Sequence, residues 1–214
     1  MIYLTLAVFI IVTTIHLYAS WHKDQKLRNY TKPFILLALL AFYMLGAAEM
    51  RISIVLALIF SWIGDVLLIP KGVKWFTAGG IAFMISHAFF ILGYSKDISP
   101  ETLPIWIMVL LEAIFLVIVF FIFKKLKEHL KKSLFYPMFL YLMINGTMNC
   151  FAILRMLSHT NRATIITCIG AVLFFVSDTT LFFVRFKKDS ALKSHFITML
   201  TYAVGELLIV IGLI

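Results

Sequence analysis

Residues 103–123, LPIWIMVLLEAIFLVIVFFIF, form an apolar run that a single carboxylate, Glu112, interrupts. A helix of about 20 apolar residues crosses the hydrocarbon core of a bilayer. Seven further apolar stretches flank this run, and no segment between them is long or polar enough to form a soluble domain. The sequence therefore predicts one all-α integral membrane domain over residues 1–214 with eight transmembrane helices. The predicted spans are residues 2–20, 33–49, 52–69, 75–94, 103–123, 134–157, 163–185 and 195–214.

The composition of the whole chain supports a lipid-facing exterior. Hydrophobic residues make up 63% of the 214 residues, charged residues only 14%, and the mean hydropathy is +1.03. Soluble domains average about a quarter charged residues. The net charge of +9 comes from basic residues between the apolar runs, so we attribute it to anionic lipid headgroups and topology. The expected partner is the lipid bilayer and not nucleic acid; the oligomeric state is left open.

The distribution of Lys and Arg predicts the orientation of the chain. Fifteen of these 19 residues fall in the odd-numbered connections between spans, and the exceptions are Arg51, Lys96, Arg155 and Arg162. Cytoplasmic loops carry the excess of basic residues in membrane proteins. We therefore expect a multi-pass cell-membrane protein with both termini outside the cytoplasm. A bacterial plasma membrane is the first choice of compartment, and the endoplasmic reticulum is the second.

Two stretches of the chain resemble one another. FSWIGDVLL at 60–68 and FFVSDTTL at 174–181 each place a small residue and then an aspartate inside an apolar run. The spans that follow carry matching helical stripes, which are Phe76, Gly80, Phe83 and His87 in one and His195, Met199, Tyr202 and Glu206 in the other. Four spans separate the two copies, so both would have the same orientation. The pattern is typical of two parallel four-helix repeats.

The aspartates of these stretches, Asp65 and Asp178, are the candidate catalytic residues. Ionisable side chains within a span usually face the bundle interior or a water-filled cavity. In a pair of carboxylates, one can stay protonated and act as an acid while the other stays ionised and activates water. The residues alone do not say which is which. The alternative is that each aspartate only forms hydrogen bonds that fix helix packing.

Further polar residues lie within the predicted spans and are candidate substrate-binding residues. Interhelical hydrogen bonding is the alternative role for each of them. Asn149 follows Asn145 by one helical turn, and Tyr141 precedes Asn145 by one turn. No motif for a metal site, a phosphate loop or an acyl-serine mechanism is present, so we expect no metal and no cofactor. The candidates are His87, Tyr94, Asn145, Asn149, Tyr202 and Glu206.

The combined pattern resembles the lysoplasmalogenase, or YhhN-like, family of membrane proteins, from residue 60 onward. The matching motifs are Gly64-Asp65-x-x-Leu68, Phe76-x-x-Gly79, Phe83-x-x-x-His87, Ser177-Asp178-x-x-Leu181 and Thr201-Tyr202. The chain departs from the family pattern at two positions. It has Ala203 where the family has a second tyrosine, and Glu206 near the position of a glutamine.

The resemblance implies hydrolysis of the vinyl ether bond of a lysoplasmalogen, or of a related lysolipid. The products would be a fatty aldehyde and glycerophospho-ethanolamine or -choline. Protonation of the alkene carbon gives an oxocarbenium ion that water captures, which suits an acid and a second carboxylate. A lysophospholipid substrate predicts a cavity between the helices, open toward the cytoplasmic leaflet. The alternatives are a proton-coupled transporter of a small solute and a structural membrane protein without turnover.

Overall fold

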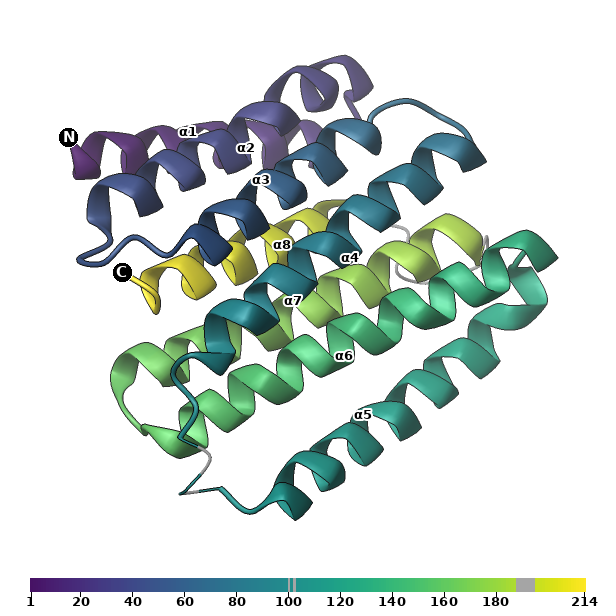
Figure 1. Cartoon of the computed structure of the whole chain (residues 1–214). Helices are drawn as coiled ribbons and strands as arrows, with labels where there is room; N and C mark the ends of the chain where they lie inside the picture. The colour runs from purple at the N-terminus through teal and green to yellow at the C-terminus, as the bar shows by residue number, and fades with distance from the viewer. Residues whose placement is uncertain (100, 102, 188–194) are drawn as a thin grey trace.

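The computed structural model describes residues 1–99, 101, 103–187 and 195–214, and within these residues the fold is all-helical (Figure 1). Eight α-helices occur in the described part of the chain. They are α1 (Ile2–Trp21), α2 (Gln25–Gly46), α3 (Ile52–Leu67), α4 (Val73–Ser95), α5 (Ile105–Leu126), α6 (Phe135–Ser158), α7 (Arg162–Phe186) and α8 (His195–Ile211). Two short 3-10 turns, η1 (Lys127–His129) and η2 (Lys132–Leu134), connect α5 to α6.

Helices that are consecutive in the sequence pack side by side, as Figure 1 shows for α1 to α4 and for α5 to α8. Helix α4 packs on α6, and α8 packs on α1 and α2, so these contacts join the two halves of the chain. Helix α5 lies at one edge of the bundle and packs mainly on α6. Both halves therefore contain a series of consecutive helical hairpins. Their relation as two parallel repeats stays a prediction.

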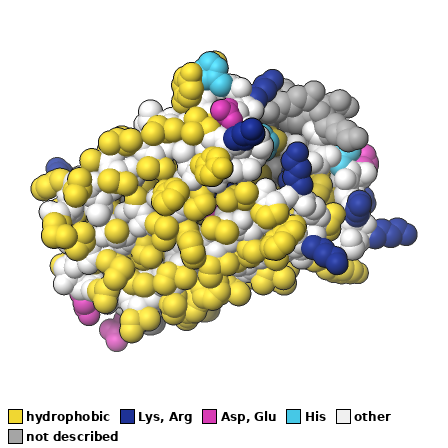
Figure 2. All heavy atoms as spheres, turned by 90° about the horizontal axis from the view of Figure 1, so that it is seen from above, with side chains coloured by type: hydrophobic (Ala, Val, Ile, Leu, Met, Phe, Trp, Pro, Cys, Tyr) yellow, Lys and Arg dark blue, Asp and Glu magenta, His cyan; other side chains and the backbone are white. Residues whose placement is uncertain are grey.

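The exterior of the bundle is apolar over its flank. Figure 2 shows hydrophobic side chains across most of the visible face, and most of the visible Lys and Arg side chains near one end. Six of the described helices are long and apolar enough to cross a membrane, whereas α3 and α8 have 16 and 17 residues. These are the features of a multi-pass membrane protein. Insertion of all eight helices and the placement of the termini stay predictions.

Helix α2 begins earlier than hydropathy predicts. The carboxylate of Asp24 caps it by accepting a hydrogen bond from the Leu27 backbone N–H at 3.1 Å, so the helix starts at Gln25 rather than at residue 33. Pro33 lies inside the helix instead of at its start. Arg28 and Lys32, expected in the first connection, are therefore helical. Lys188 and Lys193, expected in the last odd connection, lie outside the described residues.

A cluster of ion pairs closes the end of the bundle that carries the even-numbered connections. Oδ2 of Asp97 accepts hydrogen bonds from Nη1 of Arg51 at 2.8 Å and from Nε of Arg155 at 2.7 Å. The same Arg155 donates from Nη1 to Thr167 Oγ1 at 2.9 Å and from Nη2 to the Gly212 carbonyl at 3.3 Å. The cluster thus joins the ends of α3, α4, α6, α7 and α8. Burial alone would raise the pKa of Asp97, but the hydrogen bonds and charges of the two guanidinium groups outweigh it and lower the pKa.

Helices α7 and α8 approach each other through glycines. A Cβ atom built on Gly170 would lie 2.6 Å from the Gly205 carbonyl oxygen and 2.7 Å from the Ile209 backbone nitrogen. Small residues at helix interfaces allow this close backbone contact in membrane proteins. The interface therefore has no space for a side chain at Gly170.

We predict that Gly170→Ala destabilises the protein. The methyl group must push two backbones apart, and overpacking of this kind costs about 1–3 kcal/mol. The measurement is the thermal unfolding midpoint of purified protein in one detergent. Gly80→Ala is the matched control, because its Cβ would lie 4.0 Å from the nearest atom, Cδ2 of Tyr141. An unchanged midpoint for Gly170→Ala would contradict the close α7–α8 contact.

We also predict that Asp97 contributes stability that depends on pH. Its folded-state pKa is lowered, so the contribution is complete above the ordinary value of about 3.9 and is lost as the pH falls toward the lowered pKa. Asp97→Asn should cost roughly 2 kcal/mol at neutral pH, because charge-assisted hydrogen bonds are lost. It should also flatten the pH dependence of unfolding below about pH 5. Asp24→Asn is the control, since asparagine caps helices as well as aspartate does.

Candidate functional site

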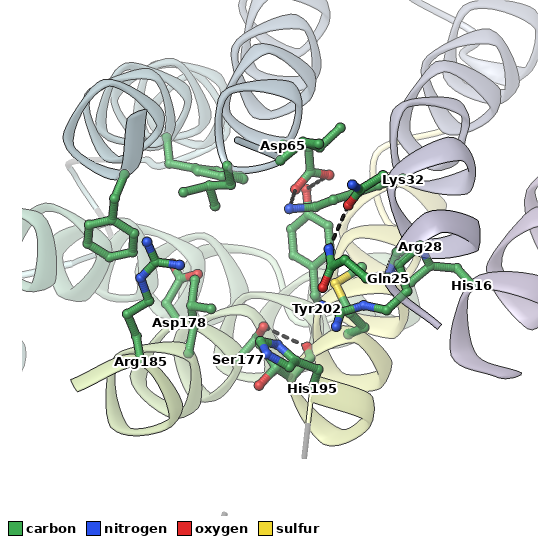
Figure 3. A pocket seen from close by; sticks show the side chains of 18 residues that line it. His16, Gln25, Arg28, Lys32, Asp65, Ser177, Asp178, Arg185, His195 and Tyr202 are labelled. Atoms are coloured by element: carbon green, nitrogen blue, oxygen red, sulfur yellow. Dashed lines mark hydrogen bonds and ion pairs between the residues drawn. The ribbon is translucent and has the colours of Figure 1, made fainter. Parts of the chain in front are cut away.

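A cavity of about 100 Å³ opens at the end of the bundle that carries the odd-numbered connections (Figure 3). Helices α1, α2, α3, α4, α7 and α8 all contribute to its wall. Its lining residues are His16, Gln25, Arg28, Asn29, Lys32, Asp65, Leu68, Ile69, Phe76, Phe83, Ser177, Asp178, Leu181, Arg185, His195, Thr198, Met199 and Tyr202. The two predicted aspartates therefore face one shared cavity, at the end where the sequence predicts its opening.

Asp178 is held by neutral donors from helix α6. Its Oδ2 accepts a hydrogen bond from the Tyr141 hydroxyl at 2.5 Å and another from Nδ2 of Asn145 at 2.7 Å. Nε2 of His87, on α4, lies 3.5 Å from the same oxygen. No described residue donates a hydrogen bond to Oδ1. Asp178 thus has one oxygen fixed from behind and one without a donor.

Asp65 has a different set of partners. Its Oδ1 lies 3.1 Å from the Lys32 ammonium of α2, and its Oδ2 accepts a hydrogen bond from the Tyr202 hydroxyl of α8 at 2.9 Å. Both oxygens are therefore engaged, one of them by a full positive charge. Figure 3 shows Asp65 and Lys32 on one side of the cavity and Asp178 and Arg185 on the other.

The predicted substrate-binding residues fall at different distances from the cavity. Tyr202 lines it directly. His87 and Asn145 are fully buried and contact Asp178 from behind, and Asn149 donates to the Asn145 backbone carbonyl at 2.9 Å, one turn deeper. These three residues therefore support the aspartate and do not line the cavity. Whether they affect substrate binding stays a prediction.

Tyr94 and Glu206, the remaining two candidates, are also fully buried and do not line the cavity. The Tyr94 ring stacks on Phe90, with 5.9 Å between the ring centroids. The carboxyl of Glu206 lies close to the Ser61 hydroxyl, although neither of its oxygens has a hydrogen bond of normal geometry with a described residue. The structure thus places both residues deeper in the bundle than the two aspartates. A role in substrate binding stays a prediction for them as well.

An apolar groove of about 30 Å³ lies between α4 and α6, next to the cavity. Phe76 lines both spaces, and Tyr141 lines the groove while donating to Asp178. The rest of the groove wall is almost entirely apolar and comes from Thr77, Gly80, Ile81, Met84, Leu134, Pro137, Met138 and Phe182. The groove therefore ends at the side chains that surround one of the two carboxylates.

Sequence reasoning missed several residues of the site. Lys32 and Arg28 were placed in a connection because hydropathy marked the apolar part of α2 only, although the cap at Asp24 indicates the earlier helix start. Tyr141, one turn before Asn145, is not among the predicted substrate-binding residues. His16, near the end of the predicted span 2–20, is 1% exposed, and it lines the cavity with His195. The signal for Tyr141 was its shared helical stripe with the two asparagines.

In the described residues, no group of three or more His, Cys, Asp or Glu side chains is arranged to hold a metal ion.

Comparison with known proteins identifies the family of the chain. No curated protein and no solved structure matched the chain. The model of the YhhN family matches residues 27–213, which include the helices that line the cavity apart from α1 and the first two residues of α2. On this match, and in agreement with the resemblance of its motifs, the chain belongs to the YhhN family.

Proposed function

We propose that this chain is a membrane hydrolase that cleaves the vinyl ether bond of a lysoplasmalogen or a related lysolipid. Membership of the YhhN family is consistent with this activity. The observation that carries the proposal is the pair of carboxylates on one cavity, of which Asp65 pairs with a cation and Asp178 has neutral donors only. Such a pair suits a reaction that needs one acid and one base.

The shape of the site supports a lipid as the substrate. The cavity is lined by charged and polar side chains at the end that carries the basic connections, whereas the adjoining groove is apolar. A lysolipid has the same division into a charged headgroup and a hydrocarbon chain. With its headgroup at the cavity mouth and its chain leaving the site along the groove between α4 and α6 toward the lipid, its vinyl ether would lie beside Asp178.

We assign the delivery of the proton to Asp178. Its Oδ2 already accepts two hydrogen bonds, so a proton would reside on Oδ1, which has no donor among the described residues. Asp65 accepts from donors at both oxygens, including the Lys32 ammonium, which suits a carboxylate that remains ionised. A carboxylate has about four lone-pair sites, so Asp65 can still accept a proton from water.

The reaction then proceeds in balanced steps. Asp178 transfers its proton to the alkene carbon farther from the ether oxygen, and the C=C electrons form the new C–H bond. The positive charge is shared by the other alkene carbon and the ether oxygen, beside the Asp65 carboxylate. Water bonds to that carbon and gives a proton to Asp65, which produces a hemiacetal. The bond between the hemiacetal carbon and the glycerol oxygen then breaks as the proton on Asp65 passes to that oxygen and the hydroxyl proton returns to Asp178, which leaves an aldehyde and a free glycerol hydroxyl.

The test is aldehyde release from a lysoplasmalogen by the purified protein in detergent. We expect activity in the wild type and a loss of at least about 100-fold in Asp65→Asn and in Asp178→Asn, because general acid–base catalysis contributes that much. Glu112→Gln is the matched control. This carboxyl lies on α5 away from the cavity and accepts a hydrogen bond from Thr147 that glutamine can also accept.

Three outcomes would contradict the proposal. Wild-type activity that survives in both aspartate variants would exclude the mechanism. Absence of aldehyde together with proton-dependent solute uptake into liposomes would favour a transporter. Cleavage of an ester-linked lysolipid in preference to the vinyl ether would indicate a lysophospholipase.

The assignment of roles makes a separate prediction about chemical rescue. Asp65→Ala removes an anion and leaves the Lys32 ammonium without its counter-ion, so added formate should bind there and raise the residual rate of aldehyde release. Asp178→Ala lacks the proton donor, and formate at neutral pH should give no comparable increase. The measurement is the initial rate against formate concentration for both variants. Rescue of Asp178→Ala alone would reverse the two roles.

A further inference from the structure

The mouth of the cavity contains more positive charge than the two aspartates neutralise. Lys32 pairs with Asp65, but Arg28 and Arg185 form no ion pair with any described residue. The rings of His16 and His195 lie within electrostatic reach of Arg28 and Lys32. Figure 3 shows His16, Gln25, Arg28 and Lys32 together on one side of the cavity. A concentration of basic groups without counter-ions is a feature of anion-binding sites.

Arg28 is the best-placed anion ligand in this group. Its side chain is half-buried, and its Nε is fully enclosed without a hydrogen-bond acceptor among the described residues. A guanidinium removed from water is costly unless an anion accepts its N–H groups. Its planar fork of donors matches the oxygens of a phosphate. The proposed hydrolysis makes no use of this side chain, so the arginine needs another role.

The neighbours of Arg28 on α2 complete a set of donors. Nε2 of Gln25 donates to Oδ1 of Asn29 at 2.6 Å, which leaves the Asn29 amide N–H groups available for a ligand. Both residues line the cavity with Arg28. These side chains come from adjacent turns at the start of one helix, and the Asp24 cap fixes that start. A helix holds such donors in a defined arrangement that a flexible connection would not provide.

The position of Arg28 also matches the length of a lysophospholipid. Arg28 precedes Lys32 by four residues, which is one turn and about 6 Å along the helix. Lys32 marks the depth of Asp65 through its ion pair. A phosphate at Arg28 would therefore lie about one turn nearer the mouth than the carboxylates. The three-carbon glycerol that separates the phosphate from the ether oxygen spans a distance of this order.

We propose that Arg28, with Gln25 and Asn29, forms a subsite for the phosphodiester of the substrate headgroup. The inference rests on the proposed function and adds a specificity determinant to it. The Lys32 ammonium adds positive charge beside the subsite, and the rings of His16 and His195 line the same cavity. A free phosphate shares the chemistry of the headgroup, so the experiment separates the two sources.

The first experiment measures binding without catalysis. Thermal unfolding of detergent-purified protein is followed with increasing sn-glycero-3-phosphoethanolamine, inorganic phosphate or glycerol. The diester should stabilise the wild type and Lys26→Gln, and its apparent Kd should rise about ten- to hundredfold in Arg28→Gln, because charge-assisted hydrogen bonds are lost. Lys26 is a matched control because it is an exposed cation on the same helix that does not line the cavity.

The second experiment measures specificity. The ratio of kcat/KM for a lysoplasmalogen to that for a phosphate-free 1-alkenylglycerol should fall at least tenfold in Arg28→Gln and stay constant in Lys26→Gln. The loss should appear in KM. Arg28→Lys keeps the charge without the planar fork, so its ratio of kcat/KM values should be intermediate. If Arg28→Gln does not fold, Arg28→Lys serves as the folded variant.

The outcomes distinguish failure of this inference from failure of the proposed function. Equal losses on both substrates in Arg28→Gln, or diester binding unchanged by the substitution, would overturn the subsite. Binding of inorganic phosphate without binding of the diester would overturn the headgroup as its ligand. If the wild type releases no aldehyde, the proposed function fails, and diester binding still decides whether the subsite exists.

Discussion

Polar groups inside an apolar exterior must find their partners within the protein, because lipid offers none. This constraint governs how the bundle is arranged around its two carboxylates. Asp65 and Asp178 together have partners on four other helices, since Lys32 comes from α2, Tyr202 from α8, Tyr141 from α6 and the nearby His87 from α4, while the aspartates themselves lie on α3 and α7. A shift of any one of these helices would leave a buried charge or hydroxyl without a partner. The cavity is thus fixed by the hydrogen bonds that its acids require.

Each of the two aspartates has a partner that belongs to the other half of the chain. Asp65 belongs to the first half and accepts from Tyr202 in the second, while Asp178 belongs to the second half and lies near His87 in the first. Both partners are members of the matching helical stripes that the sequence shows. Consequently neither half contains a complete site, and the chemistry depends on how the halves pack. This crossed arrangement gives the predicted repeat a physical meaning, although the repeat itself stays a prediction.

Sequence patterns predicted eight helices and the burial of the two aspartates within them, because hydropathy and buried charge are strong signals in a membrane protein. They could not predict depth around a cavity. Tyr94 and Glu206 share helical faces with site residues, yet they lie away from the cavity, since periodicity indicates a face and not a position along the bundle axis. The start of α2 was missed because a polar first turn and Pro33 conceal it from a hydropathy average. That error moved Arg28 and Lys32 out of the site. Conversely, two exceptions to the charge distribution, Arg51 and Arg155, have a structural reason in their shared partner Asp97.

For the proposed hydrolysis, the groove between α4 and α6 has a consequence for the fate of the products. The ion pairs of Asp97 tie together the opposite end of the bundle, while the cavity opens at the near end and the groove ends at Phe76 and Tyr141, next to Asp178. One leads to the aqueous phase and the other to hydrocarbon. A lipid cut between them would divide into a water-soluble fragment and an oily fragment that depart in different directions. Neither fragment would have to pass the other, and the aldehyde would enter the bilayer before it reached the aqueous phase.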